Sequence, residues 1–249
     1  MLAPENTLAA FRRAIVDRAE GIEFDVQLAK DGAAVVFHDE TLARTARREG
    51  MVSDFSSTEL AQFDIGSWFN EINPKYANPE FVNERVATLS ETLGFLSDFR
   101  GLIFIELKCR DSEIAPLTDA VCRVIENSGL AAQIIVKSFR LAVIPRVRML
   151  CPDVRTAALF APKIMTILRK EKHIVNIAEQ FGSDEISIHF SLATRKLMKK
   201  AEQRSLPVTI WTADNPRWIR RGLKLGINAI ITNNPAPLLE KRRGVLGTL

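Results

Sequence analysis

Short strand-like runs alternate with amphipathic stretches along most of this chain. Stretches such as 117–127 and 193–203 have the periodicity of helices that cover one face of a sheet. A strand, a crossover helix and a further strand form parallel neighbours in one sheet. The alternation therefore predicts an α/β fold, and a (β/α)8 TIM-type barrel if eight strands close into a ring. Seven principal runs are present, at 21–27, 103–108, 133–138, 154–160, 185–189, 207–212 and 228–232.

Two further elements and one irregular region complete this prediction. A helix is expected near residues 7–19, after the cap-forming pair Asn6-Thr7, and a short extra strand is expected at 35–38. Residues from about 44 to 86 do not follow the alternation. A long connection in a compact enzyme is typically a binding or lid element, although a packed surface loop explains the same residues equally well. No linker divides the 249 residues, which predicts one domain over 1–249.

Two carboxylates stand in one strand-like run. Glu23 and Asp25 are two residues apart, so their side chains share a face of the strand. Two buried acids repel each other and lose hydration unless a cation or proton compensates them, and Mg²⁺ or Ca²⁺ accepts such oxygen ligands. Glu106 and Lys108 share a face of another run and would add a third carboxylate and an ammonium. This set predicts a cation site for a phosphate-bearing substrate, whereas the alternative is that each acid pairs with an arginine at a strand end.

Histidines end two of the strand-like runs. His38 follows an apolar run close to the two acids and is a candidate for proton transfer. His189 ends the run at 185–189 and could face the barrel mouth.

Several short sequence motifs are spread over nearly the whole chain. They are Pro4-Glu5-Asn6-Thr7, Glu23-Phe24-Asp25-Val26, Asp31-Gly32, His38-Asp39, Leu42-Ala43-Arg44-Thr45, Glu106-Leu107-Lys108, Trp211-Thr212 and Ile230-Ile231-Thr232-Asn233-Asn234-Pro235. In order and spacing they resemble the glycerophosphodiester phosphodiesterase family. The resemblance implies a TIM-type barrel with an insertion after its second strand, and metal-dependent hydrolysis of glycerophosphodiesters to glycerol 3-phosphate and an alcohol.

The resemblance also implies roles for individual residues. Glu23, Asp25 and Glu106 correspond to the family's ligands for one divalent cation, Mg²⁺ or Ca²⁺. His38 corresponds to one of two catalytic histidines, Lys108 to a phosphate contact and Trp211 to an aromatic wall for the substrate.

The chain departs from the family pattern at its beginning. The family has a His-Arg-Gly triplet on its first strand, which supplies the other catalytic histidine, whereas this chain begins Met1-Leu2-Ala3-Pro4. Both the strand count and the motifs therefore predict a barrel that lacks its first strand. One hypothesis is an active enzyme whose true start lies upstream. The other is a catalytically impaired barrel that binds metal and phosphodiester, and a different metal-dependent barrel enzyme is a third reading because fold alone does not determine chemistry.

Composition excludes several other classes. The formal charge of +4 comes with basic clusters, among them Arg220-Arg221 and Lys241-Arg242-Arg243, which are expected on solvated helix faces. A nucleic-acid partner is not expected, because aromatic residues do not interleave with these clusters. The three cysteines lack paired spacing, so neither zinc nor disulfides are indicated, and a reducing, cytoplasmic location without membrane insertion is expected.

Overall fold

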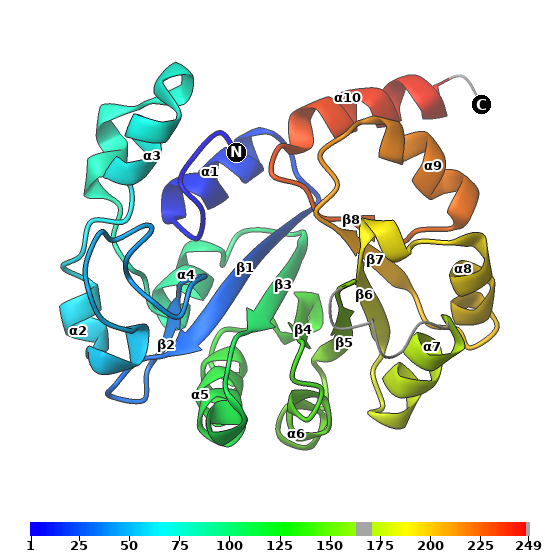
Figure 1. The fold of residues 1–249 in the computed structure, drawn as a ribbon, viewed down its shortest axis with the longest axis horizontal. Helices are drawn as coiled ribbons and strands as arrows, with labels where there is room; N and C mark the ends of the chain where they lie inside the picture. The colour runs from blue at the N-terminus through cyan, green and yellow to red at the C-terminus, as the bar shows by residue number, and fades with distance from the viewer. Residues whose placement is uncertain (163–170, 248–249) are drawn as a thin grey trace.

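The computed structural model describes residues 1–162 and 171–247. Its eight-stranded sheet has the order β2-β1-β3-β4-β5-β6-β7-β8 and curls into a partial barrel (Figure 1). All neighbours from β1 through β3 to β8 are parallel, and β2 alone is antiparallel. The strands are β1 Gly21–Leu28, β2 Ala34–Val36, β3 Leu102–Leu107, β4 Ile134–Ser138, β5 Arg155–Phe160, β6 Glu185–His189, β7 Val208–Trp211 and β8 Ala229–Ile230.

Helices follow the strands and cover the outer face of the sheet (Figure 1). One apolar core lies between β1, β3, β4 and the helices around them, and a second lies between β5, β6, β7 and theirs. None of the helices in the described ranges is long and apolar enough to cross a membrane. The helices are α1 Leu8–Val16, α2 Ser57–Leu60, α3 Ser67–Ile72, α4 Leu89–Phe95, α5 Ile114–Glu126, α6 Val143–Leu150, α7 Glu171–Gln180, α8 Arg195–Glu202, α9 Arg217–Leu225 and α10 Pro235–Leu246.

The predicted α/β alternation is confirmed, and the differences are at element ends. The first helix stops at Val16 rather than near residue 19, because Arg18 has a left-handed backbone with φ of 61° that cannot continue a helix. The extra strand ends at Val36, so His38 lies in the loop beyond it. The last strand is only two residues long, Ala229–Ile230.

Between its two outer parallel strands, β1 and β8, the sheet is open. Leu102 donates to the carbonyl of Glu20 and Lys108 to that of Val26, so the even-numbered residues of β1 bond to β3. By alternation, the backbone groups of Gly21 and Glu23 point to the opposite side, toward the gap. Within residues 1–162 and 171–247, no strand fills this place between β8 and β1, in agreement with the strand count from the sequence.

The region between β2 and α4 contributes short helices rather than strands of the main sheet. Trp68, Phe69 and Phe81 form a small core there that also includes Ala3. At Gly66 an added Cβ would lie 1.8 Å from the carbonyl oxygen of Phe81, so only glycine fits this close approach. These contacts connect the inserted region to the beginning of the chain.

Candidate active site at the mouth of the open barrel

Three carboxylates meet on the inner face of β1 and β3. Asp25 lies directly beside Glu106 in the parallel register, and Glu23 is two residues earlier on the same face. One ligand oxygen from each carboxylate lies within 4.8 Å of the other two. The shared face predicted from the spacing of these acids is therefore present.

Two lysines hold the carboxylates together. Lys108 Nζ lies 3.3 Å from Asp25 Oδ1 and 3.2 Å from Glu106 Oε1. Lys137 Nζ, from β4, lies 2.6 Å from Glu23 Oε1 and 3.6 Å from Glu106 Oε2. The acids thus pair with lysines inside the barrel, not with arginines at strand ends, among the residues described.

Sequence reasoning missed Lys137. Its side chain is 2% exposed, and it lies opposite Glu106 in the β3–β4 register. The available signal was a lysine directly after the apolar run Ile134-Ile135-Val136, the same kind of signal that identified Lys108. What the run could not reveal is that β4 lies next to β3.

Burial and mutual repulsion control the ionisation of this cluster. Burial, followed by the charge of Glu23, raises the pKa of Asp25 from 3.8 to about 6. Burial by itself would lower the pKa of Lys137, but Glu23 and Glu106 outweigh it and hold the pKa above its ordinary value. The same balance, with Asp25 and Glu106, raises the pKa of Lys108. Both lysines therefore stay charged beside the acids.

The motif before α1 supports Asp25 directly. Asn6 donates from Nδ2 to Asp25 Oδ2 at 2.9 Å, and its Oδ1 accepts the backbone N–H of Asp25 at 3.0 Å. Asn6 adopts a left-handed backbone with φ of 56°, a conformation that asparagine tolerates better than most residues. Thr7 then caps α1 by accepting from the N–H of Ala10.

A chain of polar contacts orients His38. His38 Nδ1 lies 2.6 Å from Asp39 Oδ1, and Arg44 Nε donates to Asp39 Oδ2 at 2.6 Å. Arg44 also donates to Glu5 Oε2 at 3.0 Å. His38 itself is 46% exposed, so its imidazole is open to a ligand while Asp39 holds one of its nitrogens.

Aromatic rings border the side of the mouth that lies across from the carboxylates. Phe139 packs edge-on against Trp211 with ring centroids 5.7 Å apart, and His189 does so from another direction at 5.5 Å. Trp211 Nε1 is buried and has no hydrogen-bond partner within the described part of the chain. Trp211 lines the cavity at the mouth, whereas His189 is not among the described residues that line it.

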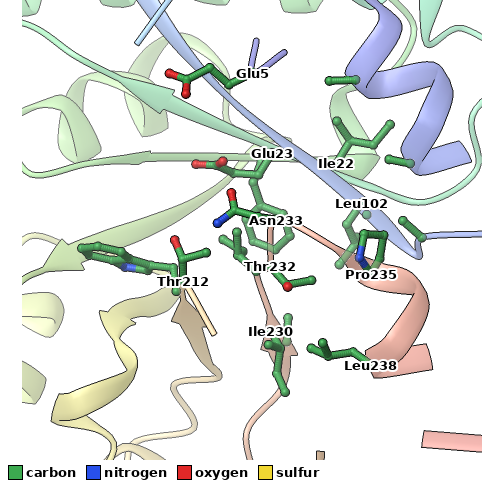
Figure 2. A pocket seen from close by; sticks show the side chains of 18 of the residues that line it. Glu5, Ile22, Glu23, Leu102, Thr212, Ile230, Thr232, Asn233, Pro235 and Leu238 are labelled. Carbon is green, nitrogen blue, oxygen red and sulfur yellow. The ribbon is translucent and has the colours of Figure 1, made fainter. Parts of the chain in front are cut away.

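One cavity of about 1140 Å³ joins these groups. The six residues to which the family resemblance gives a role line it, namely Glu23, Asp25, His38, Glu106, Lys108 and Trp211. It continues from the mouth into the gap between β8 and β1. Figure 2 shows this continuation, with Glu5 and Glu23 at one end and Ile230 and Leu238 at the other.

The fold and this site define an open α/β barrel with an acidic cluster at its mouth. A model of the glycerophosphoryl diester phosphodiesterase family matches residues 1–237. The glycerophosphodiester phosphodiesterase of Caldanaerobacter subterraneus is 30% identical over 237 residues, covering 95% of this chain and 91% of that protein. The chain belongs to the glycerophosphoryl diester phosphodiesterase family.

Other relatives and solved structures agree with this assignment. A Bacillus subtilis protein of the same name as the Caldanaerobacter enzyme is 27% identical, covering 97% of this chain and 83% of its own. An Oleispira antarctica phosphodiesterase, solved with the product sn-glycerol-3-phosphate, superposes with a TM-score of 0.84 at 22% identity, covering 96% and 92% of the two chains. The glycerophosphodiester phosphodiesterase of Agrobacterium tumefaciens does so with a TM-score of 0.76 at 24% identity, covering 96% and 94%. These structural likenesses establish the barrel fold.

Proposed function

We propose that this chain hydrolyses glycerophosphodiesters to glycerol 3-phosphate and an alcohol, with one Mg²⁺ or Ca²⁺ bound by Glu23, Asp25 and Glu106. The observation that carries the proposal is the convergence of these three carboxylates, Lys108 and His38 on one cavity. Three carboxylates against two ammonium groups leave one negative charge, and hard oxygen donors suit either ion. When bound, the ion would supply a positive charge for a phosphate oxygen.

The chain's own residues would contact the phosphate, transfer a proton and border the substrate. Lys108 lines the cavity beside Asp25 and Glu106, where its ammonium can contact a non-bridging phosphate oxygen and offset charge that grows in the transition state. His38, held by Asp39, can move one proton, either from the attacking hydroxyl or to the leaving alkoxide. The family resemblance implies attack by the neighbouring glycerol hydroxyl and a cyclic phosphate that water then opens. Trp211 would form an apolar wall for the substrate.

A second candidate function is binding of metal and phosphodiester without efficient turnover. Two proton transfers are needed, and of the histidines in the described ranges only His38 lines the cavity. The opening between β8 and β1 lies where a further strand could present a second one. This second candidate function needs the same complete ion site as an active enzyme.

The test separates ion binding from turnover. Calorimetry should show that Glu106→Gln strongly weakens Mg²⁺ and Ca²⁺ binding, because a ligand charge is lost, whereas Glu126→Gln on the exposed side of α5 leaves it unchanged. Release of glycerol 3-phosphate from glycerophosphocholine then measures turnover. Unchanged ion affinity in Glu106→Gln would refute the ligand assignment. Ion binding without product release by the parent chain would favour the second candidate.

A further inference from the structure

Positive charge is concentrated on three consecutive helices. Helices α8, α9 and α10 carry eleven Lys and Arg against two Glu, while the whole chain carries 34 against 30. The rest of the chain is therefore net acidic. The excess of positive charge lies on the helices that follow β6, β7 and β8, on the side of the barrel away from β2 (Figure 1).

These helices border an open groove of about 760 Å³ lined by six cationic side chains. Four come from α9 at positions i, i+3, i+4 and i+7, which places them along one face of the helix. The opposite face of α9 buries Ile219 and Gly222. The six residues are Arg195, Arg217, Arg220, Arg221, Lys224 and Lys241, and no acidic residue lines the groove.

Within the described ranges, none of these six side chains forms an ion pair with a carboxylate. Exposed arginines elsewhere do, as Arg47 with Glu71 and Arg204 with Glu179. Arg195 and Arg217 are also the first residues of their helices, where a cation opposes the helix dipole. Mutual repulsion and the dipole both make this arrangement costly for folding, so stability does not explain it.

The form of the groove indicates which anion it fits. Positions 217 to 224 span about 10 Å along α9, more than one phosphate group. The charged donors are long, exposed side chains, and Trp218 lies beneath Arg221 at 4.3 Å, so no open ring is offered for stacking on a nucleobase. Clusters of four to eight Lys and Arg on a helix are typical of binding to anionic lipid.

We infer that the basic groove between α8, α9 and α10 docks the chain onto the surface of an anionic phospholipid bilayer. The contact is peripheral, through phosphate head groups. Because Arg195 and Arg217 begin the helices that follow β6 and β7, they lie toward the carboxyl ends of the strands, where the candidate active site opens. Docking therefore brings that end of the barrel toward the bilayer. The inference rests on charge and geometry and does not depend on turnover.

The test is co-sedimentation with vesicles of phosphatidylcholine alone or in equal parts with phosphatidylglycerol. The parent chain should bind only the anionic vesicles, and salt should release it. The triple variant Arg217→Glu, Arg220→Glu, Lys224→Glu should lose more than about a hundredfold in affinity, at about fivefold for each charge removed. Its thermal stability should be unchanged or higher, because a carboxylate at the start of α9 agrees with the helix dipole.

A matched control keeps net charge equal. Lys30→Glu, Lys75→Glu, Arg123→Glu makes the same change in charge at exposed sites elsewhere and should keep most of the vesicle binding. An equal loss in the control would mean that net charge alone attracts the vesicles and would overturn the inference. Failure of the parent to bind anionic vesicles at low salt would overturn it as well. A third result would also overturn the inference: the parent chain binds inorganic phosphate but no vesicles, and the groove variant abolishes the phosphate binding. The groove would then serve a free anion.

Discussion

At the residue scale, two lysines inside the barrel decide whether three carboxylates can occupy one face of the sheet. Without them, Glu23, Asp25 and Glu106 would repel one another in a poorly hydrated site. Lys108 is partly exposed and open to a ligand, whereas Lys137 is enclosed and touches only the acids among the ion pairs of the described residues. Lys137 thus keeps the cluster assembled, and Lys108 is free to contact a substrate.

Replacing Lys137 with Met tests this division. Breaking a buried ion pair leaves uncompensated charge, so the free energy of unfolding in EDTA should fall by about 3 kcal/mol. Saturating Ca²⁺ should restore much of that loss, because a bound cation would compensate the same acids. Urea unfolding with EDTA and with Ca²⁺ measures both values, and Lys30→Met is the exposed control. An equal loss under both conditions would contradict the role assigned to Lys137.

Asp214 gives a prediction for pH. Burial would raise its pKa, but hydrogen bonds from Asn233 (2.7 and 3.0 Å) and Thr232 (2.8 Å) outweigh burial and lower the pKa below 3.8. A depressed carboxyl pKa contributes stability that is complete above 3.8 and disappears as pH falls through the folded-state pKa. Asp214→Asn should therefore lower unfolding free energy at neutral pH and make it less sensitive to acid.

Urea unfolding at neutral pH and in acid measures both effects. Asp98→Asn, at a fully exposed position, should behave like the parent chain at each pH. If Asp214→Asn keeps the parent's acid sensitivity, the hydrogen bonds from Asn233 and Thr232 do not stabilise the charged carboxylate.

At the scale of elements, the inserted region is tied to the site through Arg44. Its guanidinium contacts both Asp39, after β2, and Glu5, before α1, and lies 5.6 Å above the Trp68 ring of α3. One side chain thus connects three segments that are distant in sequence. Because Asp39 also holds His38, the position of the insertion affects the imidazole.

Arg44→Lys should weaken this connection, because an ammonium cannot reproduce the paired bonds of a guanidinium. If the chain turns over substrate, kcat should fall about tenfold or more, with a smaller change in KM. Loss of a contact that positions a functional side chain usually reduces activity by about this factor. Steady-state kinetics with glycerophosphocholine measure the two constants. Arg47→Lys, which affects an exposed pair in the same region, is the control. A change confined to KM would place Arg44 in substrate binding instead.

At the scale of the whole molecule, the gap between β8 and β1 leaves the barrel open. Backbone groups of Gly21 and Glu23 face it from one side. Because Ile231 donates to Ile210 of β7, those of Ile230 face it from the other. Apolar side chains of α1 and α10, among them Phe11 and Leu238, border the same opening. Unpaired strand edges of this kind favour association between chains.

A chain extended by a first strand that carries His-Arg-Gly should therefore be more stable and less prone to associate. Turnover should rise by about 10²–10⁴-fold, the usual contribution of one proton-transfer group. Glycerol 3-phosphate release, thermal unfolding and light scattering compare the two forms, with His38→Ala as the inactive control. Equal turnover by both forms would mean that another residue supplies the proton, and His189 would be the first to test.

Local periodicity was sufficient to predict much of this protein. The strand-like runs, the shared face of Glu23 and Asp25, and the number of strands in the described ranges follow from the period of two and from the count of alternating elements. These properties depend on neighbours along the chain, so sequence spacing alone determines them. The ends of elements, such as Val16 and Val36, were predicted less accurately, because caps and backbone conformation determine them residue by residue.

Contacts between distant segments were decided only by the tertiary structure. Lys137 meets Glu23 because β3 stands between β4 and β1, and strand order cannot be read from the spacing within one run. The contact of Arg44 with Glu5 spans 39 residues and depends on how the insertion folds back. The basic groove needs three helices side by side, each of which in the sequence is only a solvated charged face. The sequence by itself determined which residues share a strand face, and the packing of strands and helices determined which charges meet.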